Sequence, residues 1–317
     1  MLALCVAIAS VVACDRTAPD VQIDAKDPAA VRAAMSAIET SLRAARVDEA
    51  LRIATRLSEV APTNGEAFEL LARAHLARAT SATNPLIVRE ARLAAATAYA
   101  NAVGFLPPNA GLLNAAGVAA QQCGDGSAAV DFFARAAAID PSNPQHPLFA
   151  GLALLQVGRL DDARKALEVA KALDPKSPWP VVALSGLALQ SGDATTALAR
   201  AREARVLDAR NDELRVAEAK ALRKLGRHDE VLTLLLALPE DARLTEAITW
   251  EIAAAHDALG DKDTAAHAWG KWAEISGSAQ AAVDAARRWT DAGDPIQAAS
   301  WMNVAKQRGW RGEPAAK

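Results

Sequence analysis

The chain has 317 residues and a formal net charge of −3, and its hydrophobic share of 51% contains much alanine, while aromatic residues make up only 4%. The near balance of charge excludes a broad basic surface for nucleic acid. The scarcity of aromatic residues disfavours a large β-rich core, whereas alanine favours helix. The three cysteines, Cys5, Cys14 and Cys123, form neither a disulfide framework nor a cysteine-based metal site.

An apolar leader, MLALCVAIASVVAC, begins the chain. It is shorter than the roughly 20 residues that span a bilayer, and it ends in small residues, so we predict a signal peptide over residues 1–13. Its last four residues, VVAC, resemble the lipobox of bacterial lipoproteins, which implies that Cys14 carries lipid after cleavage. Residues 14–27 then combine the attachment site with a polar, flexible tether. Because no Lys or Arg precedes the apolar run, a cytosolic protein with an apolar N-terminus is the alternative.

A first pair of helices is predicted over residues 28–64. Asp27 is a typical helix cap, and Pro28 suits the first helical turn that follows it. Pro62 closes the second helix of the pair, because proline cannot continue a helix. The turn between the two helices holds Ala45 where the later copies have glycine, so this copy is degenerate, as terminal repeats often are.

The second pair of helices is longer than the others. The interval from Pro62 to Pro107 covers 45 residues, 11 more than the 34-residue period of the copies that follow. The surplus lies around residues 78–90, where Asn84 and Pro85 are typical of a helix cap and a first helical residue. It is either a surface insertion without a role or an edge specific to a partner, since insertions in repeat arrays map to loops on one face.

Residues 110–177 carry one 34-residue pattern twice, as AGLLNAAGVAAQQCGDGSAAVDFFARAAAIDPSN and PQHPLFAGLALLQVGRLDDARKALEVAKALDPKS. Both copies have glycine at the turn, alanine at two fixed positions of the second helix, and Asp-Pro after it. This helix–turn–helix period resembles the tetratricopeptide repeat (TPR). The resemblance implies an all-α fold, a right-handed α-solenoid of about eight TPR-like repeats over residues 28–312. Each helix pair would bury its apolar face only by stacking on its neighbours.

Turn glycines recur at the period of the repeat. A helix that ends in a left-handed residue favours glycine, and another residue there costs about 1–2 kcal/mol. The sixth copy departs from the pattern, because Val231 and Leu238 replace small residues and Pro239 ends its second helix early. The turn glycines are Gly124, Gly158, Gly192, Gly226 and Gly260 at steps of 34, followed by Gly293.

The last two repeats contain six of the seven tryptophans, before a short tail at residues 313–317. One interpretation is a bulky cap that closes the end of the solenoid. The other is an aromatic patch that anchors a partner. The six are Trp250, Trp269, Trp272, Trp289, Trp301 and Trp310.

No catalytic constellation is present in the sequence. The five histidines lack ligand spacing, and neither a phosphate-binding Gly-x-x-x-x-Gly-Lys loop nor a Gly-x-Ser-x-Gly elbow occurs. Cys123 lies near a turn and is interpreted as a small packing residue. We therefore expect no enzyme activity, no metal, no cofactor and no small-molecule substrate.

The remaining candidate site is a groove. In TPR proteins the first helix of each pair lines a concave surface that binds peptides or helices. Here the corresponding positions predict an apolar strip beside a basic end, suited to an amphipathic helix or extended segment with an acidic end. The alternative is that the leucines only pack between neighbouring helices. The predicted groove residues are Leu148, Leu152, Leu155, Trp179, Val182, Leu189, Lys220, Arg223 and Lys224.

Together these resemblances imply a non-enzymatic scaffold for protein–protein interaction. It would be a TPR lipoprotein of the bacterial cell envelope, lipid-anchored to a membrane through its N-terminus and facing the periplasm. Its layout is similar to that of lipoproteins that assist outer-membrane assembly or act as secretin pilotins. Its partner would be a protein or peptide, not nucleic acid. The alternative is a soluble periplasmic or cytosolic TPR adaptor or co-chaperone without a lipid anchor.

Overall fold

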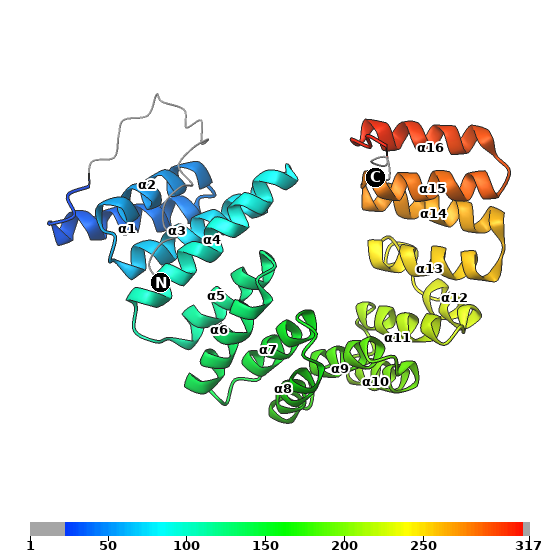
Figure 1. Cartoon of the computed structure of the whole chain (residues 1–317), viewed down its shortest axis with the longest axis horizontal. Coiled ribbons are helices and arrows are strands. Elements are labelled where there is room, and N and C mark those ends of the chain that lie inside the picture. Colours follow the sequence, from blue (N-terminus) through cyan, green and yellow to red (C-terminus); the bar gives the residue numbers. More distant parts are fainter. Residues whose placement is uncertain (1–22, 313–317) are drawn as a thin grey trace, which may run out of the picture. The chain divides into compact units, whose positions relative to one another are not determined.

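The computed structural model describes residues 23–312, which form α-helices joined by turns and contain no strand (Figure 1). The predicted signal peptide at 1–13, the predicted lipid-attachment residue Cys14 and the tail at 313–317 lie outside the described residues. Among the described helices, none is long and apolar enough to cross a membrane.

The helices fall into two compact units that divide after Gly124. The first contains α1 (Pro28–Arg43), α2 (Val47–Val60), α3 (Gly65–Ser81), α4 (Pro85–Phe105) and α5 (Ala110–Gln122). The second contains α6 (Gly126–Ile139), α7 (Gln145–Gln156), α8 (Leu160–Leu173), α9 (Trp179–Gln190), α10 (Ala194–Leu207), α11 (Glu213–Lys224), α12 (His228–Leu236), α13 (Glu246–Leu259), α14 (Lys262–Ser276), α15 (Ala279–Asp291) and α16 (Pro295–Gln307).

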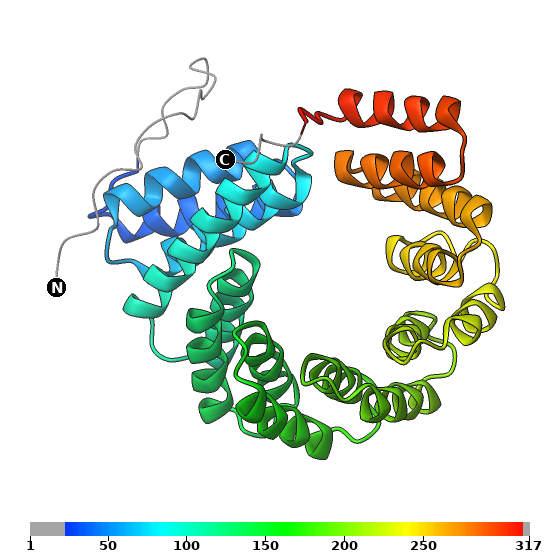
Figure 2. The same cartoon turned by 45° about the vertical axis from the view of Figure 1, so that its right-hand side comes forward.

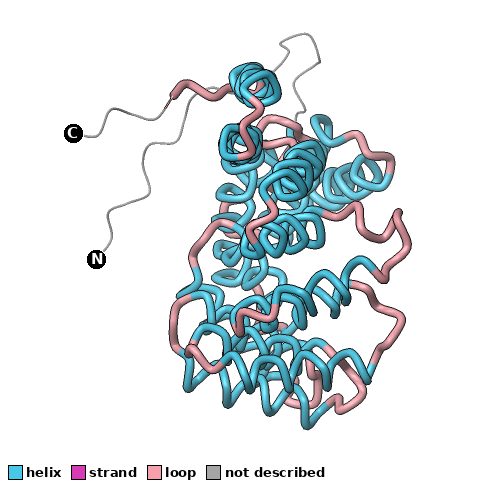
Figure 3. The backbone as a smooth tube through the Cα atoms, turned by 90° about the vertical axis from the view of Figure 1, so that its right-hand side faces the viewer, coloured by secondary structure: helices cyan, strands magenta, loops and turns pink. Residues whose placement is uncertain are grey.

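Within each unit, every helix packs against the next one along the chain, through short connections (Figure 3). In the second unit the first helices of successive repeats also contact one another, α7 with α9, α9 with α11 and α11 with α13. Figure 2 shows α7, α9, α11 and α13 on the inner side of an arc within this unit, and α8, α10 and α12 on its outer side. The prediction of an all-α repeat solenoid is therefore confirmed, with 16 helices in the described part of the chain.

The turn after α7 shows why the repeat needs glycine. Gly158 has φ +77°, in the left-handed region. Its N–H donates to Leu155 O at 3.1 Å, and the N–H of Arg159 donates to Leu154 O at 2.9 Å. These two bonds form a Schellman motif, which satisfies carbonyl groups that the helix end would otherwise leave unpaired. The predicted turn glycines all have positive φ, so their structural role is confirmed.

The first repeat makes the same turn without glycine. Ala45 has φ 55° and is the one non-glycine residue with positive φ in the described part of the chain. The N–H groups of Ala45 and Arg46 donate to Leu42 O at 3.1 Å and Ser41 O at 2.8 Å, so the Schellman bonds persist. The predicted departure of this copy from the repeat pattern therefore produces a strained turn, because the Cβ of Ala45 crowds the backbone.

Ala45→Gly should therefore stabilise the first unit by about 0.5–1 kcal/mol. Relief of the left-handed strain stabilises the folded state by about 1–2 kcal/mol. The greater conformational freedom of glycine stabilises the unfolded chain and offsets part of this gain. Urea denaturation measures the difference. The matched control is Ala44→Gly, one residue earlier, where φ is −85° and there is no strain to relieve. That change should destabilise, and the prediction is wrong if both variants do.

The 11 surplus residues of the second repeat do not form a loop. Helices α3 and α4 have 17 and 21 residues, four and seven more than the 13 of α5 and the 14 of α6, which accounts for the whole surplus. The predicted cap is present, because the Asn84 side chain accepts a hydrogen bond from the N–H of Leu86 at 2.9 Å, with Pro85 in the first turn. The surplus, for which the sequence left open a surface insertion or an edge specific to a partner, is therefore a lengthening of both helices.

The sixth repeat keeps its packing despite its larger residues. Val231 and Leu238 are buried in a core with Leu235 and Ile248. The early end predicted at Pro239 is confirmed, since α12 has only nine residues. A longer connection, residues 237–245, consequently leads from α12 to α13.

Candidate partner-binding groove

The predicted apolar strip begins on α7, an inner helix of the second unit. Leu148, Leu152 and Leu155 are partly buried, and all three pack against a core that includes Leu154 and Leu167. Each therefore contributes to packing and also keeps part of its side chain exposed. The sequence offered two interpretations, packing between helices and a groove surface. The buried part of each leucine fits the first, and the exposed part is compatible with the second.

The strip continues on α9, which contacts α7. Trp179 lies at the start of α9 and is 44% exposed, the most exposed side chain of the strip. Val182 and Leu189 are partly buried. The structure thus places the six predicted apolar residues on two adjacent inner helices.

The predicted basic end lies on α11, the next inner helix, but its three residues differ. Lys220 and Lys224 are exposed. Arg223 instead donates from Nε to Oε2 of Glu251 on α13 at 2.8 Å, and its guanidinium group lies over the ring of Trp250, 4.7 Å from the centroid. Cation–π contact of this kind holds a guanidinium group in place.

Glu251 is a buried charge that sequence reasoning missed. Its side chain is 1% exposed. Burial raises the pKa of the Glu251 carboxyl, while the hydrogen bond from Arg223 and the charge of Lys220 oppose that rise. The equivalent positions in the three preceding repeats hold Phe149, Ala183 and Ala217, so a carboxylate at an otherwise apolar position was the available signal.

A second buried carboxylate connects α11 to α10. Glu218 is 3% exposed. Its Oε1 accepts a hydrogen bond from Arg202 Nε at 2.8 Å, and its Oε2 forms an ion pair with Arg205 Nε at 2.8 Å. Buried ion pairs of this kind fix geometry more than they add stability. Helix α11, which carries the predicted basic end, is therefore held from two sides.

The C-terminal tryptophans pack chiefly against one another and their neighbours. Trp269 forms edge-to-face contacts with Trp250 and Trp272, with centroid distances of 6.2 and 5.1 Å. Trp269 and Trp289 are buried, as the capping interpretation expects, whereas Trp250 keeps an exposed part beside Arg223. Such contacts contribute stability beyond the area they bury.

The described residues contain no group of three His, Cys, Asp or Glu side chains that could hold a metal ion. His75 is the histidine with the clearest perturbation, because burial lowers its pKa to about 4. A histidine with that pKa is neutral near pH 7 and is a poor proton acceptor there. Cys123 ends α5, and its Sγ lies 3.2 Å from Ala120 O.

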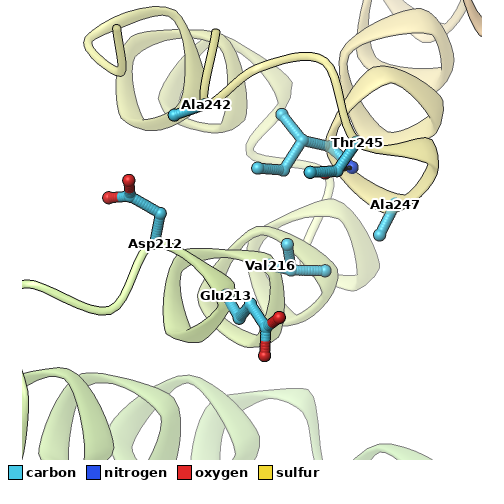
Figure 4. Close-up of a pocket in the computed structure, with 7 residues that line it drawn as sticks. Asp212, Glu213, Val216, Ala242, Thr245 and Ala247 are labelled. Carbon is cyan, nitrogen blue, oxygen red and sulfur yellow. Dashed lines mark hydrogen bonds between the residues drawn. The ribbon is translucent and has the colours of Figure 1, made fainter. Parts of the chain in front are cut away.

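A cavity opens at the other end of α11, beside the connection between α12 and α13 (Figure 4). It has a volume of about 430 Å³. Its apolar lining comes from Val216 on α11, Ala242 on the connection opposite, and Ala247 and Ile248 on α13. In Figure 4 the Asp212 carboxylate lies at one edge of the space between Val216 and Ala242, and the Glu213 carboxylate points to the opposite side of α11. The cavity exists because α12 ends early, so the signal for it was Pro239, although the sequence did not predict a cavity.

Residues 120–179 match the family model for the tetratricopeptide repeat. This segment contains most of the doubled 34-residue pattern and covers α6, α7 and α8. Residues 120–179 are therefore similar to tetratricopeptide repeats. A search of curated protein sequences gives no match.

Solved structures of TPR proteins resemble this chain in fold over more than residues 120–179. A tetratricopeptide repeat protein from Parabacteroides merdae has a TM-score of 0.64 and 12% identity, over 87% of this chain and 98% of that one. The Cut9–Hcn1 hetero-tetramer of the APC/C gives a TM-score of 0.53 and 15% identity, over 84% of this chain and 48% of that one. Identities this low indicate a shared TPR solenoid fold alone.

Proposed function

We propose that this chain is a non-enzymatic scaffold whose inner surface over α7, α9 and α11 binds a partner protein or peptide. The observation that carries the proposal is the apolar strip on α7 and α9, led by Trp179 at 44% exposure, beside the exposed Lys220 and Lys224. An exposed tryptophan beside partly exposed leucines forms the kind of surface that anchors a partner. TPR proteins use this inner side for binding, as the resemblance in the sequence implied.

The chemistry of the surface indicates the chemistry of the partner. Apolar anchors would lie on the strip, and acidic residues would lie near Lys220 and Lys224. Arg223 adds little net charge, because Glu251 neutralises it at 2.8 Å. The attraction should therefore be modest and should weaken as ionic strength rises, since these lysines are exposed.

The test is Trp179→Asp, followed by thermal melting and by pull-down of the partner from native cells. Folding should be nearly intact because the residue is exposed, while affinity should fall about ten- to hundredfold, or about 1–3 kcal/mol. The matched control is Val206→Asp on the outer helix α10, where the apolar side chain is 83% exposed. The control should bind normally. Equal binding by both variants would exclude Trp179 as an anchor.

We propose further that the scaffold is a lipid-anchored protein of the bacterial cell envelope that faces the periplasm and assists assembly or secretion there. The support is in the sequence, since an apolar leader ends in VVAC and a polar stretch follows it. Cys14 lies outside the described residues. A single acyl chain binds membranes only marginally, so stable anchoring there requires more than one chain.

Cys14→Ser should abolish incorporation of a fatty-acid analogue in metabolic labelling and should release the protein from membranes. Cys5→Ser is the control, because Cys5 lies within the predicted signal peptide and should be removed with it. Equal labelling of the Cys14 variant and the wild type would contradict the assignment. A wild type without label would favour the soluble adaptor instead.

A further inference from the structure

The cavity at the start of α11 differs from the rest of the inner surface in charge. It lies between α11, the connection 237–245 and the start of α13. The three stretches that border the cavity contain more acidic than basic residues. Their two basic residues are Arg215 and Arg243. Their acidic residues are Asp212, Glu213, Glu240, Asp241 and Glu246.

Helix α11 is consequently bipolar along its inner row. Glu213, Ala217, Lys220 and Lys224 follow one another at steps of four, three and four residues, so they share one face. The row begins with a carboxylate and ends with two ammonium groups. Glu213 and Lys224 are 11 residues apart, which is about 16 Å along the helix.

The lining of the cavity suits one class of side chain. Val216 and Ile248 are almost fully buried and contribute to its apolar lining. The Asp212 carboxylate at the mouth is only partly neutralised by Arg215, whose Nε lies 3.5 Å from Oδ1. A long basic side chain matches this arrangement, because its methylene groups favour apolar surface while its charged head stays near carboxylates and water. A volume of about 430 Å³ is at the lower end for ligand pockets, which favours a side chain over a larger ligand.

We infer that the cavity binds a lysine or arginine side chain of the partner, with its aliphatic stem against Val216 and Ile248 and its cation at Asp212. This inference rests on the proposed function and adds a direction to it. The partner would place its basic residue at the start of α11 and its acidic residue about 16 Å away, near Lys224. A helical partner would carry the two about 11 residues apart, and an extended one about five.

The experiment requires no partner. The probes are n-butylammonium and n-butylguanidinium, with n-butanol as the neutral probe, titrated into the full chain carrying ¹³C-labelled isoleucine and valine methyl groups. Both cations should shift the Ile248 and Val216 signals saturably at millimolar concentration, and n-butanol should bind at least tenfold more weakly. Asp212→Asn should weaken cation binding at least tenfold. Asp161→Asn, in the exposed first turn of α8, is the control and should leave it unchanged.

A further variant separates the cavity from simple attraction of charge. Ala242→Trp should fill much of the space while it keeps the Asp212 carboxylate, and it should also weaken saturable binding strongly. The inference is overturned if n-butanol binds as tightly as the cations, if no probe shifts the two methyl groups up to about 100 mM, or if the filled variant binds normally. Each of these results leaves the test at Trp179 unaffected, so failure here and failure of the proposed function are distinguishable.

Discussion

Arg223→Ala should lower the free energy of unfolding by about 2–4 kcal/mol, because it leaves the carboxylate of Glu251 buried without its partner. The loss falls short of the largest losses for buried pairs, since the Arg223 side chain is 26% exposed and water can approach. Urea denaturation near pH 7 measures the effect. The matched control is Lys224→Ala, one residue later on the same helix, which should change stability by less than about 0.5 kcal/mol.

The pH dependence of this variant distinguishes an unpaired charge from lost packing. Burial raises the pKa of Glu251 above its ordinary value of 4.5 already in the wild type, and removal of Arg223 should raise it further. A folded state that binds a proton more tightly than the unfolded chain loses stability as pH rises. The destabilisation should therefore shrink as pH falls from about 7 to about 5. Arg223→Ala/Glu251→Gln should recover part of the loss at pH 7, and a loss independent of pH would contradict the role of the charge.

Gly151→Ala should destabilise the chain by about 1–3 kcal/mol, whereas Gly186→Ala should stabilise it by about 0.5–1 kcal/mol. A Cβ at Gly151 would lie 2.6 Å from both Cγ and Cδ2 of Leu167, which is fully buried and cannot move freely. A Cβ at Gly186 meets no atom within 4 Å, so only the better helix propensity of alanine acts there. Gly151 lies in α7, and Gly186 lies in α9, one residue after Ser185, which is the position equivalent to Gly151 one repeat later.

Urea denaturation of both variants tests the opposite signs, and hydrogen exchange locates the effect. Because stability in repeat arrays depends largely on nearest neighbours, the loss at Gly151 should concentrate in α7, α8 and the helices that contact them. Two variants that change stability in the same direction would contradict the account of close helix approach.

The features that the sequence predicted well depend on local chemistry. A glycine at the turn, an Asp or Asn before a first helical proline, and a proline beyond a helix each act on adjacent residues. Asn84 and Pro239 therefore mark the observed ends of α4 and α12. The strain at Ala45 belongs to the same class, since one backbone position determines it.

The features that the sequence did not predict are non-local. Arg223 and Glu251 are 28 residues apart, and only stacking of their repeats brings them to 2.8 Å. The cavity at α11 likewise depends on how the connection after α12 returns to α13. The lengthening of α3 and α4 was not predicted for a different reason, because the surplus was interpreted as an insertion around residues 78–90, although Ala, Leu and Arg at residues 85–96 favour helix.

The most direct test of the binding surface is photo-crosslinking from single positions in native cells. A photoreactive residue would replace Trp179, Val182 or Lys220 on the inner helices, and Val169 or Val206 on the outer helices, where these valines are 51% and 83% exposed. The proposal predicts one adduct of the same mass from all three inner positions, no such adduct from the outer positions, and its loss from the Val182 position when Trp179→Asp is also present. An adduct formed from the outer positions and absent from the inner ones would contradict it.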